Sequence, residues 1–383
     1  MSGHGPHTML ADANHDEAAR EHFVISLKER IASDVTPGTR MAFEARCAPA
    51  FTKANGREPA NRIDVRHALS GDSYYHMASS LKRTTQELMW DSVGETVERQ
   101  INSLIVKAKS GTKPKGSLRL DPGLKLPRYL TAVDIHCMPG NYTTDLTEDD
   151  VFAGALYDRS VFLFVMGILG PYNDDVGQTL AAYLKAENPD FKPRRILDLG
   201  CAIGHSTLPY CDAYPEAEVY AIELGAPMLR YGHARAESLG REVHFSQQNA
   251  ERTDFPDGYF DLVISHILLH ETSHKAAPKI LKETNRLLAK GGLSVHCEGP
   301  PWDRMSAYDA SILDWDTHYN AEPYIGKLHD LDPVEMMADA GFDRANYIEK
   351  FVPSLSIGAL FGDLLKEGNN GIDGNWWFFG ARK

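Results

Sequence analysis

The feature that most constrains this chain is a change of pattern after about residue 190. Short runs rich in β-branched and aromatic residues alternate there with helix-like stretches of about 10 to 15 residues. This alternation is typical of a parallel sheet whose strands are joined by crossover helices. It predicts an α/β domain with a seven-stranded, mostly parallel sheet whose last two strands form an antiparallel edge. The runs are 194–199, 217–223, 242–247, 260–266, 292–298, 345–352 and 375–383.

The first part of the chain has a different pattern. From about His22 to Lys109 apolar residues return every three or four positions, which predicts helices and no strands. The following stretch is dense in Gly, Pro and Lys and predicts a linker. We therefore expect a helical accessory region that covers a binding pocket or forms a homodimer. The expected parts are a flexible tail at 1–20, the helical region at 21–128 and a ligand-binding domain at 129–383.

Composition limits the partners of the chain. The net charge is -13 and the pI is about 5.6, so the clustered positive charge that binds nucleic acid or anionic membranes is not expected. The apolar run at 161–170 is about half as long as a membrane-spanning helix. Five cysteines without a repeated CxxC spacing, and an N-terminus without a signal-peptide core, predict free thiols and a cytoplasmic location.

The turn after the first predicted strand indicates what the domain binds. Residues 198–204 read DLGCAIG, so Asp198 ends the strand and two glycines open the turn into a helix. Ligands bind at such turns, at the carboxyl ends of parallel strands. A carboxylate at position 198 would repel a pyrophosphate and attract a cation. Glu223, which ends the second strand, is placed to accept hydrogen bonds from both hydroxyls of a ribose. The pattern therefore favours a nucleoside ligand without phosphate.

These motifs, with FDLVISHILLHE and LLAKGGL further along, resemble the class I S-adenosylmethionine-dependent methyltransferases over roughly residues 140–383. The resemblance implies a Rossmann-like fold and S-adenosyl-L-methionine as cofactor. Ala202 stands where that family often has glycine, a mild change if its φ is negative. By the resemblance, the cofactor-binding residues are Asp198, Gly200, Cys201 and Gly204 at the first turn, Glu223 and Leu224 at the second, Asn249, Ala250 and Ser265 beyond, and Tyr142 and Tyr157 folding over the ligand.

The segment after the fourth predicted strand supplies candidates for acid–base chemistry. His266, His270 and Glu271 cluster there, and histidine suits a general base because its ordinary pKa lies near neutrality. We expect His270 to face the acceptor, with a packing or capping histidine as the alternative. His266, His270 and His274 share a four-residue spacing that can bind a metal on a helix. Cys or carboxylate ligands at matching spacing are missing from this segment, so no metal is predicted.

An interval of about 30 residues after the fifth predicted strand carries many aromatic side chains. We expect Trp302, Trp315, His318 and Tyr319 to contact an organic acceptor, although a packed surface subdomain explains the same composition. A hydroxyl acceptor most needs a base, so we expect O-methylation of a small hydroxylated or phenolic molecule. The alternatives are N- or C-methylation, a nucleic-acid methyltransferase, and a non-catalytic protein that binds the cofactor and a partner.

Overall fold

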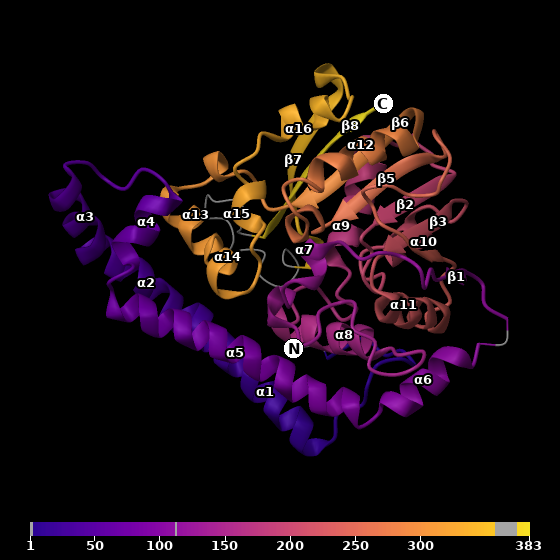
Figure 1. Cartoon of the computed structure of the whole chain (residues 1–383), viewed down its shortest axis with the longest axis horizontal. Helices are drawn as coiled ribbons and strands as arrows, with labels where there is room; N and C mark the ends of the chain where they lie inside the picture. Colours follow the sequence, from indigo (N-terminus) through magenta and orange to yellow (C-terminus); the bar gives the residue numbers. More distant parts are fainter. Residues whose placement is uncertain (1–2, 112, 357–373) are drawn as a thin grey trace.

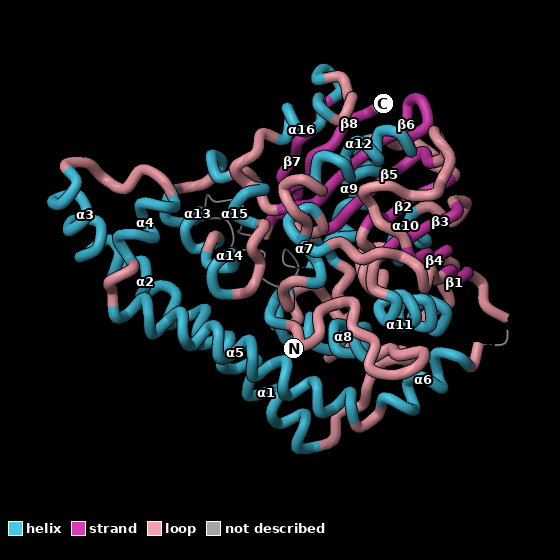
Figure 2. The backbone as a smooth tube through the Cα atoms, in the orientation of Figure 1, coloured by secondary structure: helices cyan, strands magenta, loops and turns pink. Residues whose placement is uncertain are grey.

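The computed structural model describes residues 3–111, 113–356 and 374–383. Within these residues one sheet has the strand order β1-β4-β3-β2-β5-β6-β8-β7 (Figures 1 and 2). Its neighbouring strands are parallel except at β8, which is antiparallel to both β6 and β7. The strands are β1 (Ser117–Arg119), β2 (Arg195–Leu199), β3 (Glu218–Glu223), β4 (His244–Gln247), β5 (Phe260–His266), β6 (Leu288–Glu298), β7 (Tyr347–Pro353) and β8 (Asn375–Arg382).

The predicted α/β class and the antiparallel edge are confirmed, but the predicted number of strands is wrong. The described residues form eight strands, because β1 arises inside the stretch predicted to be a linker. Ser117, Leu118 and Arg119 pair in parallel with β4. The backbone amides of Lys115 and Gly116, just before β1, donate to the carboxylate of Glu237. Such a three-residue strand is too short to show a periodic pattern in the sequence.

Helices cover both faces of the sheet, since alternate residues of each strand point to opposite sides. On one face Ile196 and Leu262 pack with α9 (Asp175–Glu187), α10 (Leu208–Ala213) and α11 (Ala226–Ser238). On the other, Leu197 and Val263 pack with α12 (Ala277–Leu287) and α16 (Pro333–Asp339). One short helix, α7 (Arg128–Thr131), precedes α8. Three others lie between β6 and α16: α13 (Ala307–Leu313), α14 (Trp315–Tyr319) and α15 (Ile325–Leu328).

The N-terminal helical region packs directly on the sheet domain. In Figure 1 the long helix α5 runs along the lower side of the molecule beside α1. Val24 of α1 and Val93 of α5 are buried in one core with Leu156 of α8 (Phe152–Phe164). At the far end α4 packs on α13. The helices are α1 (His15–Arg30), α2 (Thr36–Ala42), α3 (Ala48–Asn55), α4 (Arg62–Leu69), α5 (Ser73–Glu98) and α6 (Ile101–Lys109).

The expectation of a flexible tail at 1–20 is wrong for the described part of that segment. Met9 and Ala11 are each 1% exposed and belong to the core shared by α1, α5 and α8. The Asn14 side chain caps α1, and Glu17 completes the capping box. Burial of these small apolar groups and the cap anchor a segment whose polar composition suggested mobility.

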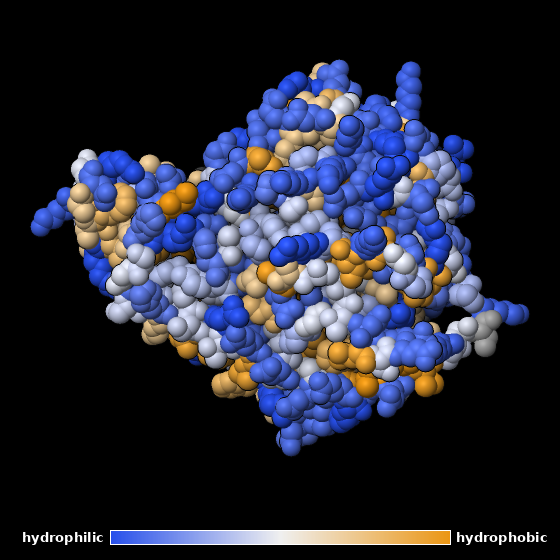
Figure 3. Space-filling view, in the orientation of Figure 1, coloured by the Kyte–Doolittle hydropathy of each residue, from blue (hydrophilic) through white to orange (hydrophobic). Residues whose placement is uncertain are grey.

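The surface does not offer a broad apolar face in the view shown. Figure 3 is mostly hydrophilic, with hydrophobic residues in scattered groups. Among the described residues, none of the helices combines the length and the apolar character needed to cross a membrane.

Candidate functional site

A cavity lies at the carboxyl ends of the central strands. Its empty space, including the part open to solvent, is about 1020 Å³. In the strand order, β3 lies next to β2 on one side and β5 lies next to it on the other, so the direction of strand addition reverses at β2. Ligands bind at such switch points. The described residues that line it are Tyr129, Leu130, His136, Tyr142, Tyr157, Asp198, Gly200, Cys201, Ala202, His205, Ser206, Ile222, Glu223, Leu224, Gln248, Asn249, Ala250, His266, Ile267, Leu268, Glu271, Thr272 and Ile280.

The turn after β2 forms the floor of the cavity. Asp198 is 1% exposed, and its carboxylate accepts a hydrogen bond of 2.5 Å from Thr207 Oγ1. Gly200 has a φ of +68°, and a side chain at this position would run into Leu268. Ala202 has a φ of +48°, so the condition under which its replacement of glycine would be mild is not met. The turn therefore keeps its left-handed geometry even where this chain replaces glycine.

Glu223 closes the second turn. Its carboxylate accepts backbone hydrogen bonds from Leu224 at 2.7 Å, Gly225 at 3.1 Å and Ala202 at 3.3 Å. Burial raises the pKa of Glu223, although these three amides partly offset that rise. Further donors, such as two ligand hydroxyls, would stabilise the ionised form. The Glu223 carboxylate therefore connects the turn after β2 to the turn after β3 through hydrogen bonds to both.

Two tyrosines and a histidine form the opposite wall. The rings of Tyr142 and Tyr157 meet edge to face with centroids 5.9 Å apart, and Tyr157 stacks on His205 at 5.7 Å. His205 Nε2 bonds Asp158 at 2.7 Å, and His7 of the N-terminal segment bonds the same carboxylate at 3.1 Å. The N-terminal segment thus supports the wall of the cavity through Asp158.

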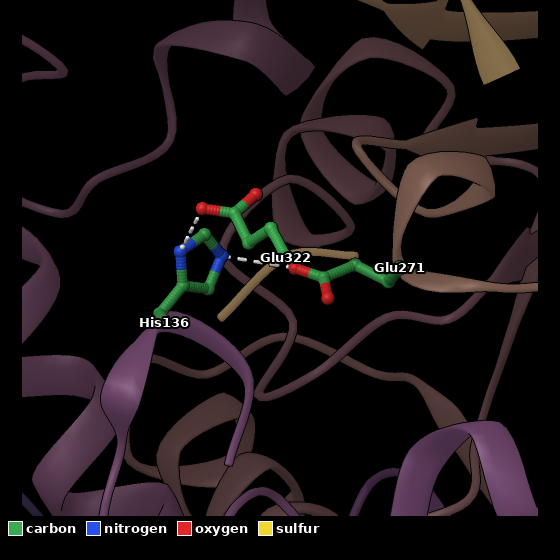
Figure 4. Close-up of side chains that lie close together, drawn as sticks. All are labelled: His136, Glu271 and Glu322. Atoms are coloured by element: carbon green, nitrogen blue, oxygen red, sulfur yellow. Dashed lines mark hydrogen bonds and ion pairs between the residues drawn. The ribbon is translucent and has the colours of Figure 1, made fainter. Parts of the chain in front are cut away.

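The other end of the cavity contains a charged cluster from distant segments. His136 Nε2 lies 2.9 Å from Glu271 Oε1, and His136 Nδ1 lies 2.9 Å from Glu322 Oε1 (Figure 4). Burial alone would lower the pKa of His136, but the two carboxylates raise it well above its ordinary value. Glu271 Oε2 is buried without a hydrogen-bond partner among the described residues. This end therefore holds an imidazolium between two carboxylates, one of which faces the cavity.

A histidine with two carboxylates can also bind a divalent cation, and the donor atoms here lie within 4.8 Å of one another. Figure 4 shows, however, that Glu271 and Glu322 approach opposite ring nitrogens of His136. A cation on one nitrogen would leave the second carboxylate across the ring. The geometry therefore favours a proton-bearing cluster, and we make no metal assignment.

The structure brings most of the predicted cofactor residues to the cavity. Gly204 and Ser265 do not line it: Ser265 Oγ bonds the core histidine His296 at 2.7 Å, and Gly204 only shapes the turn with a φ of +83°. Those that do line it are Asp198, Gly200, Cys201, Glu223, Leu224, Asn249, Ala250, Tyr142 and Tyr157.

Of the three residues predicted to be catalytic, two line the cavity and one does not. Glu271 and His266 line the cavity, and His266 Nε2 bonds Tyr210 at 3.2 Å. His270 does not line it, because its Nδ1 is held 2.6 Å from Glu298. Burial would lower the pKa of His270, but Glu298 raises it to about 9. A base must be unprotonated to act, so we correct the expectation that His270 faces the acceptor as a base.

The residues predicted to contact an acceptor lie outside the cavity lining. Trp302, Trp315, His318 and Tyr319 are not among the residues that line the cavity. Trp315 Nε1 donates to Ser79 of α5 at 3.0 Å, and Trp302 stacks on His329 at 4.7 Å. His318 bonds Arg66 of α4, whereas Tyr319 is 39% exposed. Trp315 and His318 thus join the segment after β6 to the helical region, in agreement with the alternative of a packed subdomain.

Sequence reasoning missed several residues of the site. His136 precedes the segment that carries Tyr142, and Glu322 lies in the interval after β6, but neither belongs to a local motif. Tyr129, His205 and Gln248 were also missed, although all three line the cavity. Only His205 carried a signal, since it directly follows the glycine turn.

The fold and the cavity define a Rossmann-like domain with a nucleoside site. A family model described as a methyltransferase domain matches residues 196–292. A demethylmenaquinone methyltransferase of Thermus thermophilus is 38% identical over 109 residues, which are 28% of this chain and 49% of that protein. The ubiquinone/menaquinone biosynthesis C-methyltransferase UbiE of Pasteurella multocida is 32% identical over 177 residues, 41% of this chain and 65% of that protein. The chain thus spans less than two thirds of either relative.

Among solved structures, a phosphoethanolamine N-methyltransferase 2 of Haemonchus contortus matches with a TM-score of 0.42 and 19% identity. The match covers 59% of this chain and 58% of that one. The family match and the sequence relatives agree with the motifs around Asp198 and Glu223. Residues 196–292 are therefore similar to a methyltransferase domain, in agreement with the resemblance of the motifs to the class I S-adenosylmethionine-dependent type.

Proposed function

We propose that this chain is an S-adenosylmethionine-dependent methyltransferase that acts on a hydroxyl group of a small organic acceptor. The observation that carries the proposal is the charge of the cavity. Three carboxylates line it, from Asp198, Glu223 and Glu271, against the one imidazolium of His136, and the described lining residues include no Lys or Arg. A ligand that carries sulfonium and ammonium charges complements such a cavity, whereas a pyrophosphate would be repelled.

The residues present fit the cofactor. Glu223 would accept hydrogen bonds from the ribose hydroxyls, because burial raises its pKa and further donors would stabilise its ionised form. Asp198 and the turn at Gly200 would hold the methionine end, and Asn249 with Ala250 would contact the adenine. When bound, S-adenosylmethionine supplies a methyl group already activated on sulfur. The protein then has to orient the acceptor and exclude water.

The acceptor end favours a group that can donate a hydrogen bond. Glu271 Oε2 is a buried acceptor atom without a described partner, and leaving such an atom unpaired costs free energy. An acceptor hydroxyl would satisfy it. Tyr142, whose hydroxyl lies 3.4 Å from Glu271 Oε1, flanks the same position. These contacts support a hydroxylated acceptor.

C-methylation is the second candidate, because one of the two relatives is a ubiquinone/menaquinone biosynthesis C-methyltransferase. A deprotonated phenol is nucleophilic at oxygen and at the adjacent ring carbon. The same base therefore serves either product. Analysis of the methylated atom separates the two.

The helical region supports the site in this proposal. Trp90 and Gln86 of α5 donate to the backbone carbonyl of His136 at 2.8 and 3.1 Å, so the helix helps to build the acceptor end. A homodimer stays a prediction, which light scattering on the full chain tests. The five cysteines are free thiols, on which we base the further proposal of a cytoplasmic location.

The direct test is untargeted. The full chain is incubated with labelled S-adenosylmethionine and a metabolite extract of the source cell, and mass spectrometry identifies the product that gains a methyl group and the atom that carries it. We expect a methylated hydroxyl compound. Cofactor binding without transfer to any extract component would instead support the non-catalytic alternative.

A further inference from the structure

His136 lies where three regions of the chain meet. Its backbone adopts a left-handed conformation with a φ of +56°, and its carbonyl accepts the hydrogen bonds from Trp90 and Gln86. Its ring reaches Glu271, which follows β5, and Glu322, which follows α14. Residues with an unfavourable backbone conformation persist where surrounding contacts over-determine them. The ring of His136 is therefore fixed between the two carboxylates.

Both ring nitrogens of His136 face a carboxylate oxygen at 2.9 Å (Figure 4). A short contact of this kind needs a proton on each nitrogen, since neither carboxylate can donate one when ionised. Asn320 Nδ2 donates to Glu322 at 2.7 Å and keeps that carboxylate in place. His136 thus acts as a cation, and its charge is shared by Glu271 on the cavity side and Glu322 on the buried side.

The two oxygens of Glu271 have different surroundings. Oε1 accepts from His136 Nε2 at 2.9 Å and from the Tyr142 hydroxyl at 3.4 Å. Oε2 has no partner in the described part of the chain and belongs to a residue that lines the cavity. One oxygen is therefore occupied by groups that orient the carboxylate, and the other is free to accept a proton.

We propose that Glu271 takes the proton of the acceptor hydroxyl, and that His136, held by Glu322, is a positioning residue that keeps Glu271 directed into the cavity. The inference rests on the proposed function. The acceptor O–H bond breaks, its proton passes to Glu271 Oε2, and the oxygen keeps the electron pair with which it forms the new bond to the methyl carbon. The S–CH₃ bond breaks with its electrons going to sulfur, so the balance is completed by S-adenosylhomocysteine and one released proton.

Other charged groups around the cluster agree with this assignment. Burial would raise the pKa of Glu322, but His136 lowers it, which keeps Glu322 ionised. His270 Nε2 lies 3.8 Å from Glu271 Oε1 and adds a second positive charge nearby. The titratable and charged groups around the cluster include Tyr142, Tyr157, Glu223, His270, Glu298, Cys137, Asp316 of α14 and Lys82 of α5.

The protonation of His136 can be observed without any acceptor. The full chain is labelled with ¹⁵N-histidine, and the His136 signals are those lost in the His136→Gln variant. We expect both nitrogens to carry protons at pH 8 and to remain protonated when S-adenosylhomocysteine is added. A neutral His136 ring at pH 7 would overturn the proposal, whether or not the variant is active.

The second readout is the rate of methyl transfer into the metabolite extract at limiting and at saturating S-adenosylmethionine. Glu271→Gln should lower the rate at saturating cofactor by about 10² to 10⁴-fold. His136→Gln should lower the same rate by about tenfold and leave the KM for S-adenosylmethionine within about threefold of wild type, because Glu271 loses the contact that orients it. A merely structural loss would raise that KM as well. The matched control is His233→Gln, whose ring forms a 3.8 Å pair with Glu237 on α11 outside the cavity lining.

The outcomes separate this proposal from the proposed function. Wild-type protein that neither binds S-adenosylhomocysteine nor transfers a methyl group contradicts the proposed function. Wild-type activity together with an unchanged rate at saturating cofactor in Glu271→Gln or His136→Gln contradicts only the assignment of these residues. We expect the affinity for S-adenosylhomocysteine to stay within about threefold of wild type in both variants, since the ribose and adenine contacts lie elsewhere.

Discussion

The two ends of the cavity are built in different ways. The cofactor end is formed by turns that directly follow β2, β3 and β4, so Asp198, Glu223 and Asn249 are placed by the sheet itself. The acceptor end is formed by His136, Glu271 and Glu322, which come from three segments and depend on contacts with α5. A sheet scaffold can therefore bind one ligand in a constant way while loops and added helices determine the second.

The largest expected effect is at the support of the acceptor end. Trp90 is 5% exposed and donates to the carbonyl of His136. Trp90→Ala should lower the free energy of unfolding by about 3 to 5 kcal/mol, because a large buried side chain and a hydrogen bond are lost. Urea denaturation measures this. If the cofactor end and the acceptor end of the cavity are supported independently, the folded variant should lose methyl transfer and keep its affinity for S-adenosylhomocysteine. Loss of both would show that α5 supports the whole cavity.

A smaller effect is expected from His270, behind the acceptor end. Its pKa is raised to about 9 from an ordinary value of 6.5, so its pairing with Glu298 stabilises the fold fully below pH 6.5 and progressively less as pH rises through 9. The loss is about 3 kcal/mol, at about 1.4 kcal/mol per pKa unit. Denaturation curves between pH 6 and 10 should show a weaker dependence in His270→Gln. If the free energy of unfolding depended equally on pH in wild type and in His270→Gln, the His270–Glu298 pair would add no stability.

The smallest effect is expected at the cofactor end. Ala202 has a φ of +48°, a conformation that costs a non-glycine residue roughly 1 to 2 kcal/mol. Ala202→Gly removes this cost but adds the flexibility of glycine in the unfolded chain. We expect a net gain of about 0.5 to 1 kcal/mol in the free energy of unfolding. A loss instead would show that the Ala202 methyl group contributes more by packing than its backbone costs.

The difference between the ends also explains what the sequence could predict. Asp198 and Glu223 end strands with clear hydrophobic patterns, and their function depends on the next few residues only. His136 and Glu322 are brought together by the packing of loops, which no periodic pattern records. Ser265 shows the limit even within a strand, because the alternation gives its face but not its bond to His296 on β6. The composition of the aromatic segment after β6 predicts either acceptor contacts or a packed subdomain, because composition alone does not distinguish a pocket from an interface with α4 and α5.

The central claim is that the cofactor end binds its ligand through Glu223 and independently of the acceptor end. Calorimetric titration of S-adenosylhomocysteine into wild type, Glu223→Ala and Glu271→Gln tests it directly. The account predicts binding that is weaker by about 1 to 3 kcal/mol in Glu223→Ala, the cost of leaving ribose hydroxyls unpaired, and nearly unchanged in Glu271→Gln, with no binding of NAD to wild type. Binding of NAD without S-adenosylhomocysteine, or an equal loss in both variants, would contradict it.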